Sequence, residues 1–110
     1  EWRIHSDEIH AYHLSGALFF GAVKIIEQMQ SHIPKRALVL DFSGVIYVDS
    51  SGAESLLELW QTYQEKGVSI YVYGLREQPV EMLTRVGWLK KLGEGHFCES
   101  LDDVRAQLQR

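Results

Sequence analysis

The stretch Val45-Ile46-Tyr47-Val48-Asp49-Ser50-Ser51-Gly52 decides the fold of this 110-residue chain. Its first four residues favour extended backbone, and apolar residues spaced for one face of a helix follow from Ala53 to Lys66. A strand that runs directly into a helix leaves the first backbone N–H groups of that helix without intrahelical partners. Because these groups lie at the positive end of the helix dipole, they can bind an anion or a phosphoryl group. The sequence therefore predicts a strand-to-helix corner that could hold an anion.

The chain before this corner begins with the pattern of a hairpin and a helix. Two short strand patterns at residues 2–5 and 9–14 flank the polar turn Ser6-Asp7-Glu8, and Gly16 is expected to end the second strand. Apolar residues at helical spacing then run from Phe19 to Ile33, directly before a proline. This pattern predicts a helix that stops at the proline.

A buried strand comes next. The continuous apolar run Ala37-Leu38-Val39-Leu40 predicts a strand that is buried on both faces. The residues Asp41-Phe42-Ser43-Gly44 have the composition of a turn, so we expect them to separate this strand from the stretch that begins at Val45. Beyond the second helix, Gly67 is placed for a left-handed C-cap, and residues 69–73 predict another strand.

The remaining patterns are a helix from Pro79 to Val86, a short strand at residues 96–98, and a last helix that Ser100 caps. Helices alternate with strands through most of the chain, which favours crossover connections and parallel strands. We therefore expect an α/β fold that forms a single domain over residues 1–110. Its sheet should be mixed but mostly parallel, with an N-terminal hairpin and about four helices.

The composition fits a globular domain and excludes several classes of protein. The hydrophobic share of 45% and the charged share of 24% are ordinary, and a net charge of −4 argues against binding to a nucleic-acid backbone. The single cysteine, Cys98, excludes an internal disulfide. No apolar run approaches the roughly 20 residues that cross a membrane. Because the chain begins at Glu1 without a methionine or a signal peptide, we expect a piece of a longer protein.

The order of elements resembles the STAS domain, which bacterial anti-anti-sigma factors share with the cytoplasmic tails of SulP anion transporters. Asp49-Ser50-Ser51-Gly52 lies between a strand and a helix, where that family has its signature turn. The segment Ser15-Gly16-Ala17-Leu18-Phe19-Phe20-Gly21-Ala22 is similar to the start of the first helix in SulP tails. Together these features make the chain similar to a STAS domain of the SulP, or sulfate permease, type.

Three interpretations of the corner stay open. Asp49 and Ser50 could simply cap the second helix, which contributes about 0.5–2 kcal/mol. The resemblance implies a second one, because Ser50 occupies the position that is phosphorylated in anti-anti-sigma factors. In the third, the N–H groups of Ser50, Ser51 and Gly52 bind a nucleotide or another anion, or Asp49 to Gly52 contact a partner. The sequence has no glycine-rich phosphate loop with a lysine, and only Lys66 and Arg76 are candidate cations.

The neighbouring aromatic residues Phe19 and Phe20 suggest a partner surface, because adjacent residues on a helix cannot both point inward. In the alternative interpretation, both side chains are partly buried where the chain bends into the helix. The sequence alone does not separate these alternatives.

Catalytic, metal and cofactor sites are not expected. The five histidines are scattered without the spacing of a metal site. Cys98 lies in a short apolar strand and is expected to be a buried, inert thiol. Ser50 lacks a nucleophile-elbow motif and a histidine that could activate it. We therefore predict a protein that is not an enzyme and that needs no cofactor.

The resemblance implies a non-catalytic regulatory domain of a SulP-type transporter of sulfate or a related anion. Such a domain would lie on the cytoplasmic side of a bacterial inner membrane and contact the transmembrane domain of its own chain, and possible further partners are other cytoplasmic proteins. The alternative is a stand-alone regulator, similar to anti-anti-sigma factors, that phosphorylation of Ser50 switches. Nucleic acid is not an expected partner, and the oligomeric state is left open.

Overall fold

The computed structural model describes residues 3–5, 8–18, 23–93 and 96–108. It contains a sheet with the strand order β1-β2-β3-β4-β5. β1 is antiparallel to β2, and every later pair of neighbouring strands is parallel. The strands are β1 (Arg3–His5), β2 (Ile9–Leu18), β3 (Ala37–Val48), β4 (Ser69–Tyr73) and β5 (Phe97–Cys98). The predicted mixed, mostly parallel sheet with an N-terminal hairpin is confirmed, although residues 6 and 7 of the hairpin turn lie outside the described residues.

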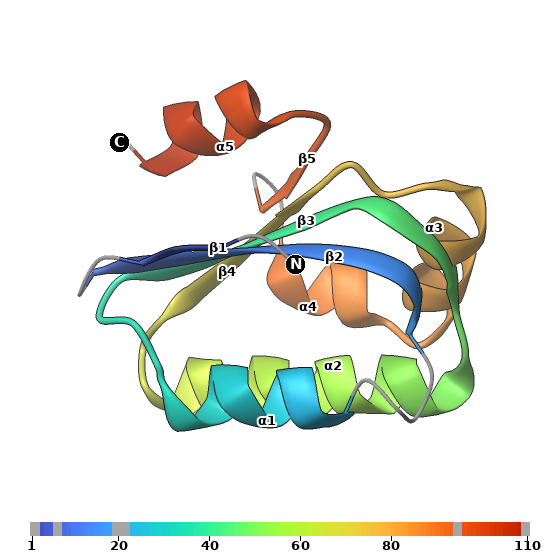
Figure 1. The fold of residues 1–110 in the computed structure, drawn as a ribbon, viewed down its shortest axis with the longest axis horizontal. Coiled ribbons are helices and arrows are strands. Elements are labelled where there is room, and N and C mark those ends of the chain that lie inside the picture. Colours follow the sequence, from blue (N-terminus) through green and yellow to red (C-terminus); the bar gives the residue numbers. More distant parts are fainter. Residues whose placement is uncertain (1–2, 6–7, 19–22, 94–95, 109–110) are drawn as a thin grey trace.

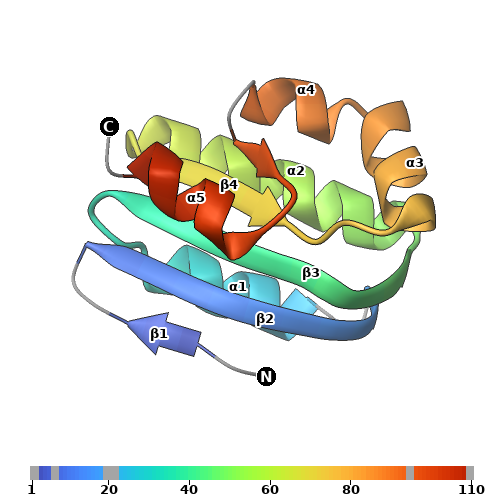
Figure 2. The ribbon, with the colours of Figure 1, turned by 90° about the horizontal axis from the view of Figure 1, so that it is seen from above.

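The helices are α1 (Val23–Ser31), α2 (Ser50–Glu65), α3 (Glu77–Arg85), α4 (Trp88–Leu92) and α5 (Leu101–Leu108). α1, α2 and α4 lie on one face of the sheet, and α5 is the one described helix on the other face (Figures 1 and 2). The two layers bury separate apolar clusters. The larger cluster fills the space between the sheet and α1, α2 and α4, whereas the smaller one consists of Ala11, Val39, Cys98 and Val104.

β3 is a single strand of 12 residues, so the turn predicted at Asp41 to Gly44 is wrong. β2 pairs with β3 along most of its length. His13 pairs with Asp41 but Ser15 pairs with Gly44, so β3 contains one more residue than β2 at this point and the turn-like residues form a bulge within the strand. Such a bulge lets a strand accept an extra residue and bend without ending. The bend carries β3 beyond the end of β4, and its last residues reach the start of α2.

The prediction that Gly16 ends the second strand is also wrong, because β2 continues to Leu18 beside the second half of β3. Two local predictions are confirmed at helix ends. Gly67 has a positive φ of 72° immediately after the C-cap of α2, and the Ser100 hydroxyl accepts a hydrogen bond from the Asp103 N–H at 3.3 Å. Local sequence therefore set the ends of several elements, while the paired length of β2 and β3 depended on tertiary contacts.

Candidate functional site

Asp49 forms the N-cap of α2 at the corner where β3 ends. Its backbone is extended, with φ −92° and ψ 179°, and its Oδ1 accepts a hydrogen bond from the Gly52 N–H at 2.7 Å. Its carbonyl oxygen accepts the first helical hydrogen bond, from the Ala53 N–H at 2.9 Å. The capping interpretation of Asp49 is therefore confirmed. One of the N–H groups predicted to bind an anion, that of Gly52, already has a carboxylate partner.

Ser50 and Ser51 form the first exposed turn of α2. Within the described part of the chain, their backbone N–H groups have no hydrogen-bond acceptor, as expected at a helix start. Both hydroxyls are accessible to solvent, whereas Gly52 is buried against the core. The corner thus offers two N–H donors and two hydroxyl groups to a ligand or a modifying enzyme.

Gln78 holds the last residue of β3 in place. Its Oε1 accepts a hydrogen bond from the Val48 N–H at 2.7 Å, and its Nε2 donates to the Val48 carbonyl oxygen at 2.9 Å. Val48 has no neighbouring β4 residue at this point, because the pairing of β3 with β4 stops at Asp41. The amide side chain of Gln78 therefore replaces a strand partner and fixes the residue directly before the cap. Sequence reasoning missed it, and no local pattern marks it.

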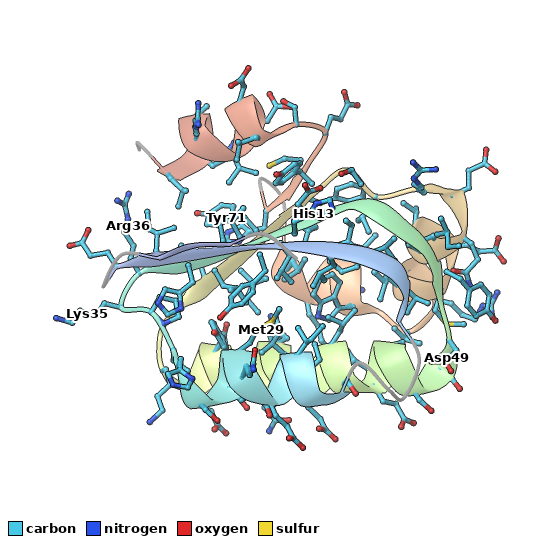
Figure 3. The ribbon with its side chains drawn as sticks, viewed as in Figure 1. His13, Met29, Lys35, Arg36, Asp49 and Tyr71 are labelled. Carbon is cyan, nitrogen blue, oxygen red and sulfur yellow. The ribbon has the colours of Figure 1, made fainter. Side chains whose placement is uncertain are left out.

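The two candidate cations have contacts elsewhere in the molecule. Arg76 lies along the edge of β3 and donates a hydrogen bond from Nε to the Ser43 carbonyl oxygen at 2.8 Å. Lys66 follows the last turn of α2, about 25 Å from Asp49 at 1.5 Å per helical residue. Figure 3 shows Asp49 at one end of the molecule and Lys35 at the other, and Lys66 lines a shallow groove with Lys35. A phosphate at this corner would depend on backbone N–H groups beside an aspartate.

Two large apolar side chains are exposed just before the cap. Ile46 is 62% exposed and Tyr47 is 41% exposed. The register between β2 and β3 shifts here, since Gly16 pairs with Val45 and Ala17 pairs with Tyr47, so Ile46 is an extra residue on the β3 side. Sequence reasoning missed this surface because the strand reads as continuously apolar. The partner surface predicted at residues 19 and 20 lies outside the described residues.

A second polar cluster lies on the α5 face of the sheet, where Figure 3 shows His13. The Nδ1 atom of His13 lies 2.7 Å from Oδ2 of Asp41, and Oδ1 of Asp41 accepts the Ser43 N–H at 2.8 Å. Burial alone raises the pKa of Asp41, but the hydrogen bonds from Ser43 and His13 outweigh burial and lower it from its ordinary value. Burial, with the Asp41 carboxylate nearby, raises the pKa of Tyr73 to about 12. This cluster fixes the bulge of β3.

The described residues contain no group of three or more histidine, cysteine, aspartate or glutamate side chains that could hold a metal ion. Cys98 is buried, as predicted, and burial followed by the charge of Asp103 raises the pKa of its thiol. Among the helices that the structure describes, none is both long enough and apolar enough to cross a membrane.

Comparisons with known proteins give one matching family model, a longer relative and solved structures of the same fold. A family model described as the STAS domain matches residues 4–104. The chain is 28% identical over 117 residues to a Bacillus subtilis (strain 168) protein named "Putative sulfate transporter YvdB". That match covers 93% of this chain but only 22% of the relative, so the chain spans about a fifth of the relative's length.

Two solved structures have the same fold. The SulP transporter STAS domain from Vibrio cholerae superposes with a TM-score of 0.77 at 24% identity, covering 96% of this chain and 84% of that one. The anti-sigma factor antagonist SpoIIAA, in its unphosphorylated form, gives a TM-score of 0.70 at 16% identity, covering 96% and 92% of the two chains. At these identities the likeness concerns the fold alone.

Proposed function

This chain belongs to the STAS domain family, and from that membership we propose that it is the regulatory domain of a SulP-type transporter of sulfate or a related anion. The observation that carries the proposal is the match of 93% of the chain to a much longer relative whose name refers to sulfate transport. In this role the domain acts through protein contacts and has no catalytic activity. It lies on the cytoplasmic side of a bacterial inner membrane, and the membrane part of the same protein carries the anion.

The contact surface that we propose consists of Ile46, Tyr47 and the exposed serines of the corner. Ile46 and the ring of Tyr47 present apolar area to water, and burying that area against a partner would be favourable by about 25 cal/mol per Å². The hydrogen bonds from Gln78 to Val48 and the Asp49 cap hold the backbone between the two large side chains and the two serines. A rigid apolar surface of this kind suits a packed contact with another part of the protein.

Uptake of radiolabelled sulfate by vesicles that contain the whole encoded protein tests this proposal. Replacement of Tyr47 with aspartate should lower uptake strongly, because a charge would then be buried in the contact. Phe97→Asp is the matched control, since Phe97 is 42% exposed but lies on β5. Equal uptake by the Tyr47 variant and the unmodified protein would count against this contact surface. An encoded protein without hydrophobic spans of about 20 residues would count against the transporter as a whole.

The second candidate function is a regulator that phosphorylation of Ser50 switches. The exposure of Ser50 at the first helical position of α2 favours it. A phosphoryl group there would add about −1.5 to −2 charges, which the helix N-terminus stabilises by at most ~2 kcal/mol. The adjacent Asp49 would oppose it, so the modification would act mainly by changing the surface that a partner meets.

Treatment with a candidate serine kinase, followed by intact-mass analysis, tests the second candidate. One added phosphate is expected, and Ser50→Ala should abolish it. Ser51→Ala is the control, because this neighbouring serine is also exposed in the same turn. An unchanged mass under conditions that modify a reference substrate, or a phosphate that persists in Ser50→Ala, contradicts switching at Ser50. Titration with a nucleotide in the same series would show whether the Ser50 and Ser51 N–H groups bind phosphate without a covalent bond.

A further inference from the structure

α5 is attached to the rest of the molecule through few buried side chains. It is the one described helix on its face of the sheet (Figures 1 and 2), where it packs against β4 and β5. Val104 is its buried residue, and Leu101 and Leu108 are only partly buried. These contacts belong to the smaller apolar cluster, while the side chains that hold α1, α2 and α4 belong to the larger one. Loss of α5 would therefore leave the larger cluster intact.

A hydrogen bond is present at each end of α5. The Arg36 guanidinium donates a hydrogen bond to the Leu108 carbonyl oxygen, and Ser100 accepts the Asp103 N–H at the helix start. The ion pair of Arg105 with Asp102 is internal to the helix and does not tie it to the sheet. A helix of eight residues is not stable alone in water, so α5 remains helical only while it is docked.

We propose that α5 detaches from the sheet as a local unit while β1 to β4 and the helices of the other face stay folded. Local openings of this kind are expected where a segment has few buried apolar contacts. Opening uncovers the sheet face formed by Ala11, Val39 and Cys98, with Tyr71 and Tyr73 beside them. α5 is thus a detachable cover over an apolar and aromatic surface.

The thiol of Cys98 reports on this opening, because it is the only thiol in the chain and is 6% exposed beneath α5. The experiment measures the rate at which an aromatic disulfide reagent labels Cys98 in the folded chain, relative to an unstructured peptide of the same local sequence. The measurement is repeated over a range of low urea concentrations. If α5 opens locally, labelling is faster than the global unfolding equilibrium permits, and it depends only weakly on urea because little surface is exposed.

Three variants identify the segment that opens. Arg36→Gln removes the anchor at the far end of α5 without a change at Cys98. It should speed labelling about three- to tenfold, as expected for the loss of one solvent-exposed hydrogen bond. Val104→Ala should speed labelling about tenfold or more. Val45→Ala is the matched control, since it makes the same chemical change in the larger cluster and should lower global stability without speeding labelling at low urea.

Hydrogen exchange of the α5 amides should be fastest in Val104→Ala, slower in Arg36→Gln, and unchanged in Val45→Ala. Labelling that follows the global unfolding equilibrium at every urea concentration would overturn the proposal. It would also be overturned if Val45→Ala accelerated labelling as much as Arg36→Gln does, since the thiol would then become accessible only when the whole domain unfolds.

Discussion

Replacing Gln78 with alanine should destabilise the domain and loosen the start of α2. The side chain makes two hydrogen bonds to one residue, at 2.7 Å to the Val48 N–H and at 2.9 Å to the Val48 carbonyl oxygen. Val48 is fully buried, so water does not reach its backbone groups easily once the amide is gone. Both groups would then be left without a partner inside the protein.

The expected loss follows from the number and the burial of these bonds. Each contributes about 0.5–1.5 kcal/mol net, and a buried backbone group without a partner costs about 1–3 kcal/mol. We therefore expect Gln78→Ala to lower the free energy of unfolding by about 2–4 kcal/mol. This is a large part of the roughly 5–15 kcal/mol that stabilises a typical domain. Gln78→Met should lose nearly as much, since methionine fills a similar volume but makes neither bond.

Urea unfolding followed by circular dichroism measures this difference, and hydrogen exchange at Val48 and Ser50 shows whether the corner has loosened. Gln61→Ala is the control, because Gln61 is exposed on α2 and its loss should change stability by at most about 0.5 kcal/mol. If Gln78→Met is as stable as the unmodified chain, the hydrogen bonds to Val48 do not support the corner. The explanation of Gln78 as a substitute strand partner would then be wrong.

Three further perturbations test other parts of the structure. Asp49→Ala should cost about 0.5–2 kcal/mol in urea unfolding, whereas Asp49→Asn should keep most of the cap; equal losses would contradict the capping role. Gly74→Ala should cost more than about 2 kcal/mol, because Gly74 has a φ of +77° and an added Cβ would lie 2.9 Å from the Ser43 backbone nitrogen; a Tm that does not fall would refute this. Asp41 has a lowered pKa in the folded state, so its contribution is fully present above its unfolded pKa and is lost as the pH falls through the lower, folded value. The stability gap between the unmodified chain and Asp41→Asn should therefore be constant above about pH 5 and shrink below about pH 4, and a gap that widens in acid would contradict it.

Some features of the corner and of other helix ends could be predicted because their chemistry is local. The Asp49 cap, the left-handed Gly67 and the Ser100 cap each depend on a few consecutive residues and on the geometry of a helix end. The alternation of elements likewise specified the fold class. The residues that determine each helix end lie within one helical turn of it in the sequence.

Other features depended on pairings that local sequence does not contain. Gln78 reaches Val48 across 30 positions, and His13 reaches Asp41 across 28. Asp41 to Gly44 looked like a turn because aspartate often accepts a hydrogen bond from an N–H two residues later, and the Ser43 N–H does donate to Asp41 here. That contact stabilises a bulge in a strand, because β2 supplies a partner along this segment. The exposure of Ile46 accompanies a second register shift, between Gly16 and Ala17 of β2.

The order of the strands has a consequence for how the chain acquires its fold. Each strand lies beside the strand that precedes it in the sequence, from β1 through β5. During synthesis, every new strand can therefore pair with a strand that has already left the ribosome, and none depends on a partner that is synthesised much later. The sheet can grow in one direction from its N-terminal hairpin, as expected for domains that fold progressively during translation. Because β5 and α5 are the last of these elements to leave the ribosome, the small apolar face under α5 stays uncovered until the rest of the sheet has formed.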